Sequence, residues 1–309
     1  MDTNGFIHTP RCRALHTGAW AAEYGWLRRN LDEFRARGAD AFAFTFDDDS
    51  DSEADVPLLQ VKGEFAVVSI HGAMMKARSK FGGTGTVDAR KAVREVVKMF
   101  RADKIGALLL DIDSPGGTVA GTEALADDVA AASAEMPTFA HISDLGASAA
   151  LWVSSQAREV SVNNTGEVGS IGVFAVLEDS SEMAKDSGLT VHLITTGPFK
   201  GAGVDGVEIT DEQVAAVQTG VDSVNDIFKA SIVRGRPFLA DNIDDLADGN
   251  VHLAEHALAL GLVDVIRSDV ATGERVAAVA RETMAANERR RQGQRNSARL
   301  AVERERARA

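Results

Sequence analysis

The sequence predicts an α/β fold built around a sheet that is buried on both faces. From Leu58 to Ile266, apolar segments of strand length alternate with amphipathic segments of helix length. Residues 105–112 form a nearly unbroken apolar run, as expected of a strand that is covered on both sides. Such alternation favours helices packed against a sheet.

The expected elements follow one another closely. Strands are expected at 65–70, 105–112, 138–142, 159–162, 170–174 and 191–195. Helices are expected at 88–100, 122–134, 148–156, 176–187 and 210–234. The last helix begins with a capping-box sequence, Thr210-Asp211-Glu212-Gln213. Two further short elements, at 254–260 and 263–266, are expected at the end of this α/β region.

Charged extensions flank this block on both sides. We expect a leader, residues 1–57, that contains an amphipathic helix at 20–37 and then an acidic linker at 47–55. The central domain is expected at 58–268. The tail, residues 269–309, is rich in arginine and is expected to be helical or disordered.

The net charge of −13 is unevenly distributed along the chain. Between residues 274 and 309, ten arginines accompany five glutamates, so the rest of the chain is more acidic than the total indicates. This acidity argues against nucleic-acid binding by the core. The tail is either a solvated extension or a basic arm for an acidic partner.

The composition also limits the cellular location and the cofactors. No apolar run approaches the roughly 18 residues that span a bilayer, and the first residues lack a signal-peptide core, so we expect no membrane anchor and no secretion. The single cysteine, Cys12, fits a reducing compartment such as the cytoplasm. The seven histidines form no metal-spaced cluster, so neither a metal nor another cofactor is expected.

A nucleophile is predicted at Ser148. It lies among small residues where a predicted strand gives way to a predicted helix, in Gly146-Ala147-Ser148-Ala149-Ala150. A serine hydroxyl attacks well only when a base takes its proton. The N–H of Ala149, at the start of the helix, would be one donor of an oxyanion hole.

A lysine is the predicted base. Only three lysines follow Ser148, and Lys185 and Lys229 lie in predicted helices, where charged residues usually face solvent. Lys200 lies in a glycine-flanked turn, Gly197-Pro198-Phe199-Lys200-Gly201. Serine–lysine pairs are a known variant of serine peptidase chemistry, and burial beside apolar groups can hold such an amine unprotonated.

A glycine pair completes the expected site. Asp113-Ser114-Pro115-Gly116-Gly117-Thr118 follows the apolar run 105–112 directly. Glycines past a buried strand can present N–H groups without side-chain obstruction, so Gly117 is the expected second oxyanion donor. Gly116 and Thr118 are expected to bind substrate. We assign the glycine-rich segment 165–173 to site architecture or subunit contact.

Together these motifs resemble the signal peptide peptidase A (protease IV) family. The resemblance covers residues 65–266 and rests on the order and spacing of four motifs, Leu109–Gly117, Gly146–Ala150, Gly169–Val173 and Gly197–Lys200. It implies a fold of the Clp-protease/crotonase type with repeated β-β-α units. It also implies a Ser148 nucleophile, a Lys200 general base, an oxyanion hole near Gly117 and Ala149, and a ring-like homo-oligomer.

The sequence departs from the membrane-bound members of that family. This chain has Ser148-Ala149-Ala150 where they usually have Ser-Gly-Gly, and Gly201 where a serine often follows the lysine. It is more similar to the head-maturation proteases of tailed phages, which process capsid-assembly proteins. We therefore expect an endopeptidase acting on capsid, portal or scaffold polypeptides, in the host cytoplasm or the procapsid interior.

Other functions remain open. A Ser-His-Asp enzyme would need a histidine after Ser148, and the first, His192, is interpreted as a core or edge residue, as is His141. A crotonase-type acyl-CoA enzyme would not need both Ser148 and Lys200. A cellular soluble peptidase of the same family and a catalytically silent ring-forming scaffold are the remaining alternatives.

Overall fold

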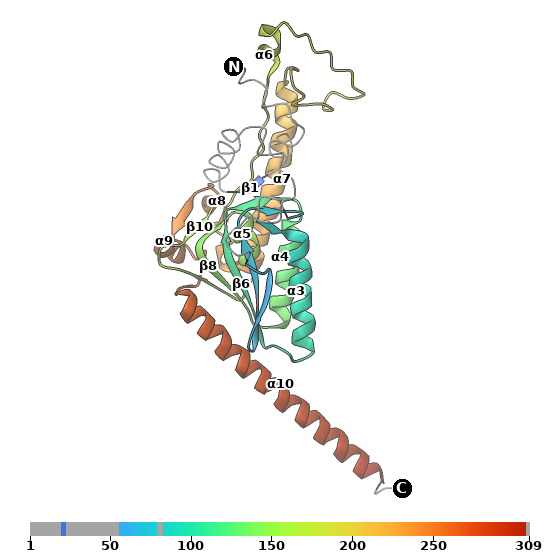
Figure 1. Ribbon diagram of the computed structural model, residues 1–309, viewed down its shortest axis with the longest axis vertical. Helices are drawn as coiled ribbons and strands as arrows, with labels where there is room; N and C mark the ends of the chain where they lie inside the picture. Colours follow the sequence, from blue (N-terminus) through green and yellow to red (C-terminus); the bar gives the residue numbers. More distant parts are fainter. Residues whose placement is uncertain (1–19, 23–55, 79–82, 307–309) are drawn as a thin grey trace, which may run out of the picture.

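The computed structural model describes residues 20–22, 56–78 and 83–306. Its centre is a mixed sheet with the strand order β11-β10-β8-β6-β3-β2, in which β9 also pairs with β8 and β12 pairs with β9 (Figure 1). The strands are β2 (Leu59–Lys62), β3 (Phe65–His71), β6 (Ala107–Ser114), β8 (Thr138–Ala147), β9 (Glu159–Val162), β10 (Glu167–Gly169), β11 (Val251–Leu253) and β12 (Val265–Ile266).

The inner strands β3, β6, β8 and β10 are parallel, whereas β2 and β11 run antiparallel at the two edges. Side chains alternate between the two faces of each strand. On β6, Leu108, Leu110 and Ile112 join the larger core cluster, and Ala107 and Leu109 join the smaller one. The sheet is therefore buried on both faces, and the predicted α/β fold is confirmed.

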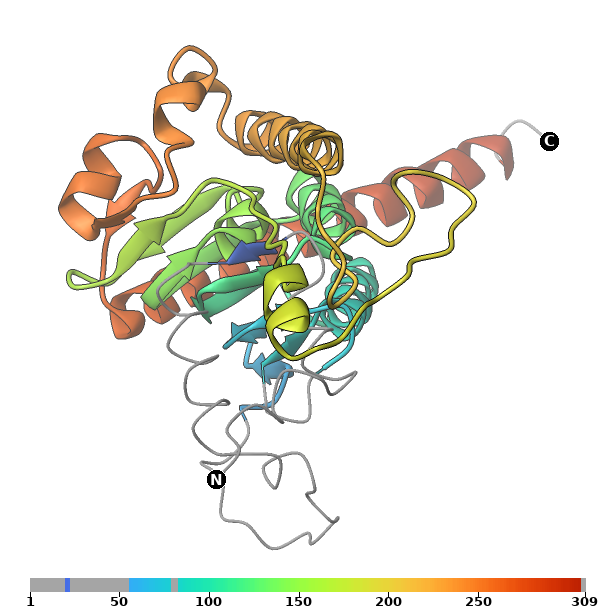
Figure 2. The same cartoon turned by 90° about the horizontal axis from the view of Figure 1, so that it is seen from above.

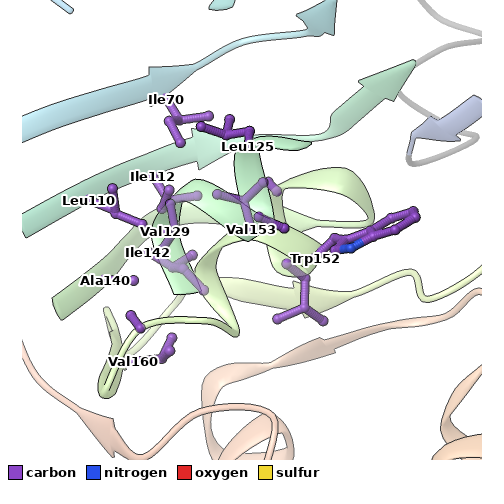
Figure 3. Close-up of a cluster of buried hydrophobic side chains, with 14 of the residues drawn as sticks. Ile70, Leu110, Ile112, Leu125, Val129, Ala140, Ile142, Trp152, Val153 and Val160 are labelled. Carbon is purple, nitrogen blue, oxygen red and sulfur yellow. The ribbon is translucent and has the colours of Figure 1, made fainter. Parts of the chain in front are cut away.

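Helices α3 (Thr86–Arg101), α4 (Thr122–Glu135) and α5 (Ala149–Ser154) supply residues to the larger cluster, part of which Figure 3 shows. Helix α10 (Asp269–Arg306) covers the other face, where Val276 and Ala280 lie in the smaller cluster with residues of β3, β6 and β8. The beginning of the arginine-rich tail is thus part of the packed domain. Farther along, α10 extends away from the body as a single helix (Figure 1).

A second, smaller sheet has the strand order β1-β7-β4-β5. Its strands are β1 (Trp20–Ala22), β4 (Met74–Met75), β5 (Thr84–Gly85) and β7 (Gly116–Thr118). Strand β3 continues through β4 and β5 into α3, and β6 continues through β7 into α4. This repeat of large-sheet strand, small-sheet strand and helix agrees with the predicted β-β-α units.

Helix α7 (Asp211–Gly235) begins with the predicted capping box, because Thr210 Oγ1 accepts the Gln213 N–H at 3.3 Å and Gln213 Oε1 accepts the Thr210 N–H at 3.1 Å. Its later turns pack on the body, where Phe228 stacks on Trp152 of α5 with ring centroids 4.4 Å apart. Short elements follow α7: a 3-10 turn (Pro237–Leu239), α8 (Ile243–Leu246) and α9 (Ala254–Ala259).

Three expected elements are wrong. Residues 20–22 begin the predicted helix 20–37 but form strand β1; the rest of that helix and the acidic linker 47–55 lie outside the described residues. No strand forms at 191–195, where Leu193 and Ile194 are exposed and have no neighbouring strand. The expected strand 170–174 is replaced by β10, which ends at Gly169.

The expected helix 176–187 shrinks to α6 (Ser181–Asp186), a single short helix in a segment that projects from the body beside the start of α7 (Figures 1 and 2). The rest of this segment, 173–210, carries apolar side chains that local patterning alone would bury. None of the described helices is long and apolar enough to cross a membrane.

Candidate active site

Ser148 occupies a sharp junction between β8 and α5. Its φ of 55° and ψ of −117° lie in a region that residues with a side chain rarely adopt, and such strain collects at functional sites. The Ser148 N–H donates to Gly169 O at 2.8 Å, which fixes the turn against β10. The Ser148 side chain is buried, and its Oγ has no hydrogen-bond partner in the described part of the chain.

Sequence reasoning missed Ser170, whose backbone lies next to this junction. β8 and β10 pair in parallel with Ala147 opposite Gly169, so Ser148 and Ser170 follow directly on adjacent strands. Ser170 also has a positive φ, 53°, and its N–H donates to Asn250 O at 2.5 Å. The Gly169-Ser170-Ile171-Gly172 pattern was the available signal, and its assignment to site architecture agrees with this position.

Glycines 116 and 117 form β7, which packs against α5 directly after Ser148. Gly116 has a φ of 88°, and a Cβ at Gly117 would collide with the carbonyl of Met74 on β4. Ser114 Oγ accepts the Gly116 N–H at 3.1 Å and donates to Gly72 O at 2.6 Å, which holds the turn in place. The structure therefore places β7, which consists of Gly116, Gly117 and Thr118, against α5, which begins with Ala149 directly after Ser148.

Lys200 lies away from Ser148 within one copy of the chain. It is exposed, and two residues before it the carbonyl of Pro198 accepts a hydrogen bond at 2.7 Å from Nε2 of Gln213, in the first turn of α7. The contact of α7 with α5 is made by Phe228, 15 residues farther along the helix, or about 22 Å at 1.5 Å per residue. Ser148 and Lys200 are thus not adjacent within one chain.

Acidic residues line the strand ends that lead to the site. His71, at the end of β3, contacts Asp111 with 3.1 Å between Nε2 and Oδ2, and this hydrogen bond raises the pKa of His71. Burial, and then the charge of Asp144, raise the pKa of Asp113. Thr84 Oγ1 accepts the His71 N–H and donates to His71 O, both at 2.9 Å, so His71 also ties β3 to β5.

A second group, His141, Ser161 and Asp269, has the residue types of a catalytic triad, but its serine is buried and hydrogen-bonded within the fold. His141 Nδ1 lies 2.8 Å from Ser161 Oγ, and its Nε2 lies 3.1 Å from Asp269 Oδ1 at the start of α10. Ser161 is buried, and its Oγ also lies within hydrogen-bond distance of Ala140 O and Thr272 Oγ1. The interpretation of His141 as a structural residue therefore agrees with its contacts, which fasten α10 to the sheet.

The interpretation of His192 as a core or edge histidine is wrong, because His192 is exposed in a segment that forms no strand. The pair His252 and His256 packs edge to face with ring centroids 4.7 Å apart on β11 and α9. Across the described ranges, no group of three or more histidine, cysteine or acidic residues is arranged to hold a metal ion.

Comparison with known proteins adds to this geometry. The sequence model of Peptidase family S49 matches residues 130–283, which include Ser148 and Lys200. A putative protease of Synechocystis is 28% identical over 61% of this chain and 68% of its own length. Protease 4 of Salmonella typhi is 27% identical over 65% of this chain but only 32% of its own length.

A viral protein is also similar. Capsid assembly protease C of Escherichia phage lambda is 24% identical over 66% of this chain and 47% of its own length. A solved structure of a 1510-N membrane-bound stomatin-specific protease aligns with 67% of this chain and 75% of its own, at 13% identity and a TM-score of 0.40. At that level of similarity, the fold described above rests on the strands and helices of this chain.

Proposed function

We propose that this chain is a serine endopeptidase with Ser148 as nucleophile and Lys200 as general base, because the model of Peptidase family S49 matches residues 130–283 and proteases are among its relatives. The observation that carries the proposal is the strained backbone of Ser148, directly before a helix, α5, that packs on the glycine strand β7. In this mechanism Ser148 Oγ attacks the substrate carbonyl as its proton passes to the amine of Lys200.

Backbone N–H groups would stabilise the oxyanion. The proposed donors are Gly117 on β7 and Ala149 in the first turn of α5, and each preorganised donor typically contributes 10²–10³ in rate. Gly117 tolerates no side chain because a Cβ there would strike Met74 O. The need for close approach of β7 to the neighbouring backbone explains a glycine at this position.

The separation of Ser148 from Lys200 implies a further step, in which the pair meets. Either segment 173–210 folds back onto its own body, or Lys200 of one copy reaches Ser148 of another. The second route is supported by the exposure of large apolar side chains on this segment. These are Val176, Met183, Leu189, Val191, Leu193, Ile194 and Phe199.

The substrate is proposed from the viral relatives. Capsid assembly protease C of phage lambda is similar over two thirds of this chain, so we propose that the enzyme cleaves capsid or scaffold polypeptides during head assembly. An oligomeric ring would place several sites around one such assembly. A role as a cellular peptidase is the alternative, and the similarity to Protease 4 of Salmonella typhi favours it.

Hydrolysis of a quenched fluorescent peptide library tests the proposal. Wild type is expected to cleave, Ser148→Ala to lose about 10⁴-fold or more in kcat/KM, and Lys200→Ala to lose 10²-fold or more. Lys185→Ala, a lysine change on the exposed face of α6, is the matched control and should retain full activity. Full activity in Lys200→Ala would rule out the proposed base.

A further inference from the structure

Part of the leader lies on the strand that the proposed site would offer to a substrate. Strand β1, residues 20–22, pairs antiparallel with β7, and the register sets Trp20 opposite Thr118, Ala21 opposite Gly117 and Ala22 opposite Gly116. Some 90 residues of chain separate the two strands, so this contact is not a local hairpin. β1 occupies the edge position of the small sheet.

Antiparallel addition to a sheet edge is a common way to bind an extended peptide, because backbone hydrogen bonds supply affinity and hold the peptide in register. β7 carries Gly117, the proposed oxyanion donor, and also packs against α5, which begins just after Ser148. A peptide paired with β7 therefore runs past the nucleophile. The leader takes the place that a substrate would take.

The register selects one peptide bond. Ala21 is the residue opposite Gly117, so the peptide bond that follows Ala21 lies beside the proposed oxyanion donor. The sequence around this bond, Ala19-Trp20-Ala21-Ala22, places small residues on both sides of it.

We infer that the leader is the first substrate of this site and that the enzyme cleaves its own chain between Ala21 and Ala22. Ser148 Oγ gives its proton to the amine of Lys200 and adds to the Ala21 carbonyl carbon. The C–N bond to Ala22 then breaks as the Ala22 nitrogen takes that proton from Lys200 and leaves as an amine. Water then hydrolyses the ester of Ala21 and restores the Ser148 hydroxyl.

The same contact gives the cleavage a regulatory consequence. While β1 is paired, the edge of β7 is occupied, and Ser148 Oγ is buried without a hydrogen-bond partner among the described residues. Removal of residues 1–21 takes away most of β1 and exposes the edge of β7, so that other polypeptides can pair with it. The uncut enzyme is therefore expected to be slow toward substrates in trans.

This inference rests on the proposed function, and intact mass with N-terminal sequencing tests it. Full-length wild type is expected to yield a new N-terminus at Ala22, whereas Ser148→Ala keeps its leader. Ala21→Pro disfavours pairing at the centre of β1, because proline is poorly tolerated inside a strand, and it places a poor residue at the cleaved bond. This variant is expected to keep its leader yet to hydrolyse a fluorescent peptide without the lag that precedes activity in wild type.

Ala43→Pro, a change in the leader outside β1, is the matched control and should be processed and activated like wild type. Immediate peptide hydrolysis by wild type that still carries its leader would overturn the inference and leave the peptidase function standing. A cut at another bond would overturn the proposed register. Absence of peptide hydrolysis in wild type and in Ala21→Pro would instead overturn the proposed function.

Discussion

At the scale of single residues, the site depends on backbone conformations that side chains disfavour. Ser148 holds a positive φ because β10 and α5 fix its N–H and the turn that follows. The sequence predicted Ser148 from its small neighbours but did not place Ser170 on the adjacent strand, because the pairing of β8 with β10 is a contact between separate strands. Lys200 was identified by elimination among lysines, which says nothing of its distance from Ser148.

Gly117→Ala is expected to lower kcat/KM by 10²-fold or more, because the new Cβ displaces β7 from Met74 O and moves the proposed oxyanion donor. Gly220→Ala is the control: a Cβ there meets nothing within 4 Å, and alanine in a helix interior stabilises by about 0.5–1 kcal/mol. Enzyme kinetics and thermal unfolding of both variants check this. Unchanged kinetics in Gly117→Ala would contradict the role of β7.

The His71–Asp111 pair predicts a pH dependence of stability. Because the folded-state pKa of His71 is raised above its ordinary value near 6.5, its stabilising contribution is present in full below that value and is lost as pH rises through the folded-state pKa. The stability difference between wild type and His71→Gln, measured by urea unfolding, should therefore shrink as pH rises from 5 to 8. A difference that grows over this range would contradict the prediction.

At the scale of elements, segments whose burial follows from local pattern were predicted well. β3 and β6 begin with apolar runs, α3 is amphipathic and α4 is rich in alanine, so sequence alone predicted whether each is a strand or a helix. Segments whose structure depends on pairing with a strand far away in the sequence were not predicted well. Residues 20–22 belong to a stretch with the apolar spacing of a helix, but they pair with β7. Residues 191–195 are mostly apolar, but they form no strand.

The stack of Phe228 on Trp152 is expected to anchor α7 to α5. Both side chains are fully buried, so Phe228→Ala should lower the free energy of unfolding by about 3–5 kcal/mol. Ile227→Ala removes a neighbouring side chain that is 45% exposed and should cost far less. Chemical denaturation compares the two, and equal losses would mean that the stack does not anchor the helix.

At the scale of the whole molecule, the separation of Ser148 from Lys200 raises the question of whether assembly brings the two residues together. If Lys200 of one copy serves Ser148 of another, a mixture of inactive Ser148→Ala and inactive Lys200→Ala chains contains some intact pairs. Mixing and refolding the two should restore a substantial fraction of wild-type peptidase activity. A mixture as inactive as its components would instead place both residues of each pair in one chain.

The central claim is that Ser148 is the nucleophile, and covalent labelling tests it most directly. A phosphonylating reagent that is specific for activated serines is reacted with the full-length chain, and the modified peptide is identified by mass spectrometry. The account predicts one label, on Ser148, with a rate that falls in Lys200→Ala and not in Lys185→Ala. A label on Ser161, in the His141–Asp269 group, or on any serine other than Ser148 would contradict it.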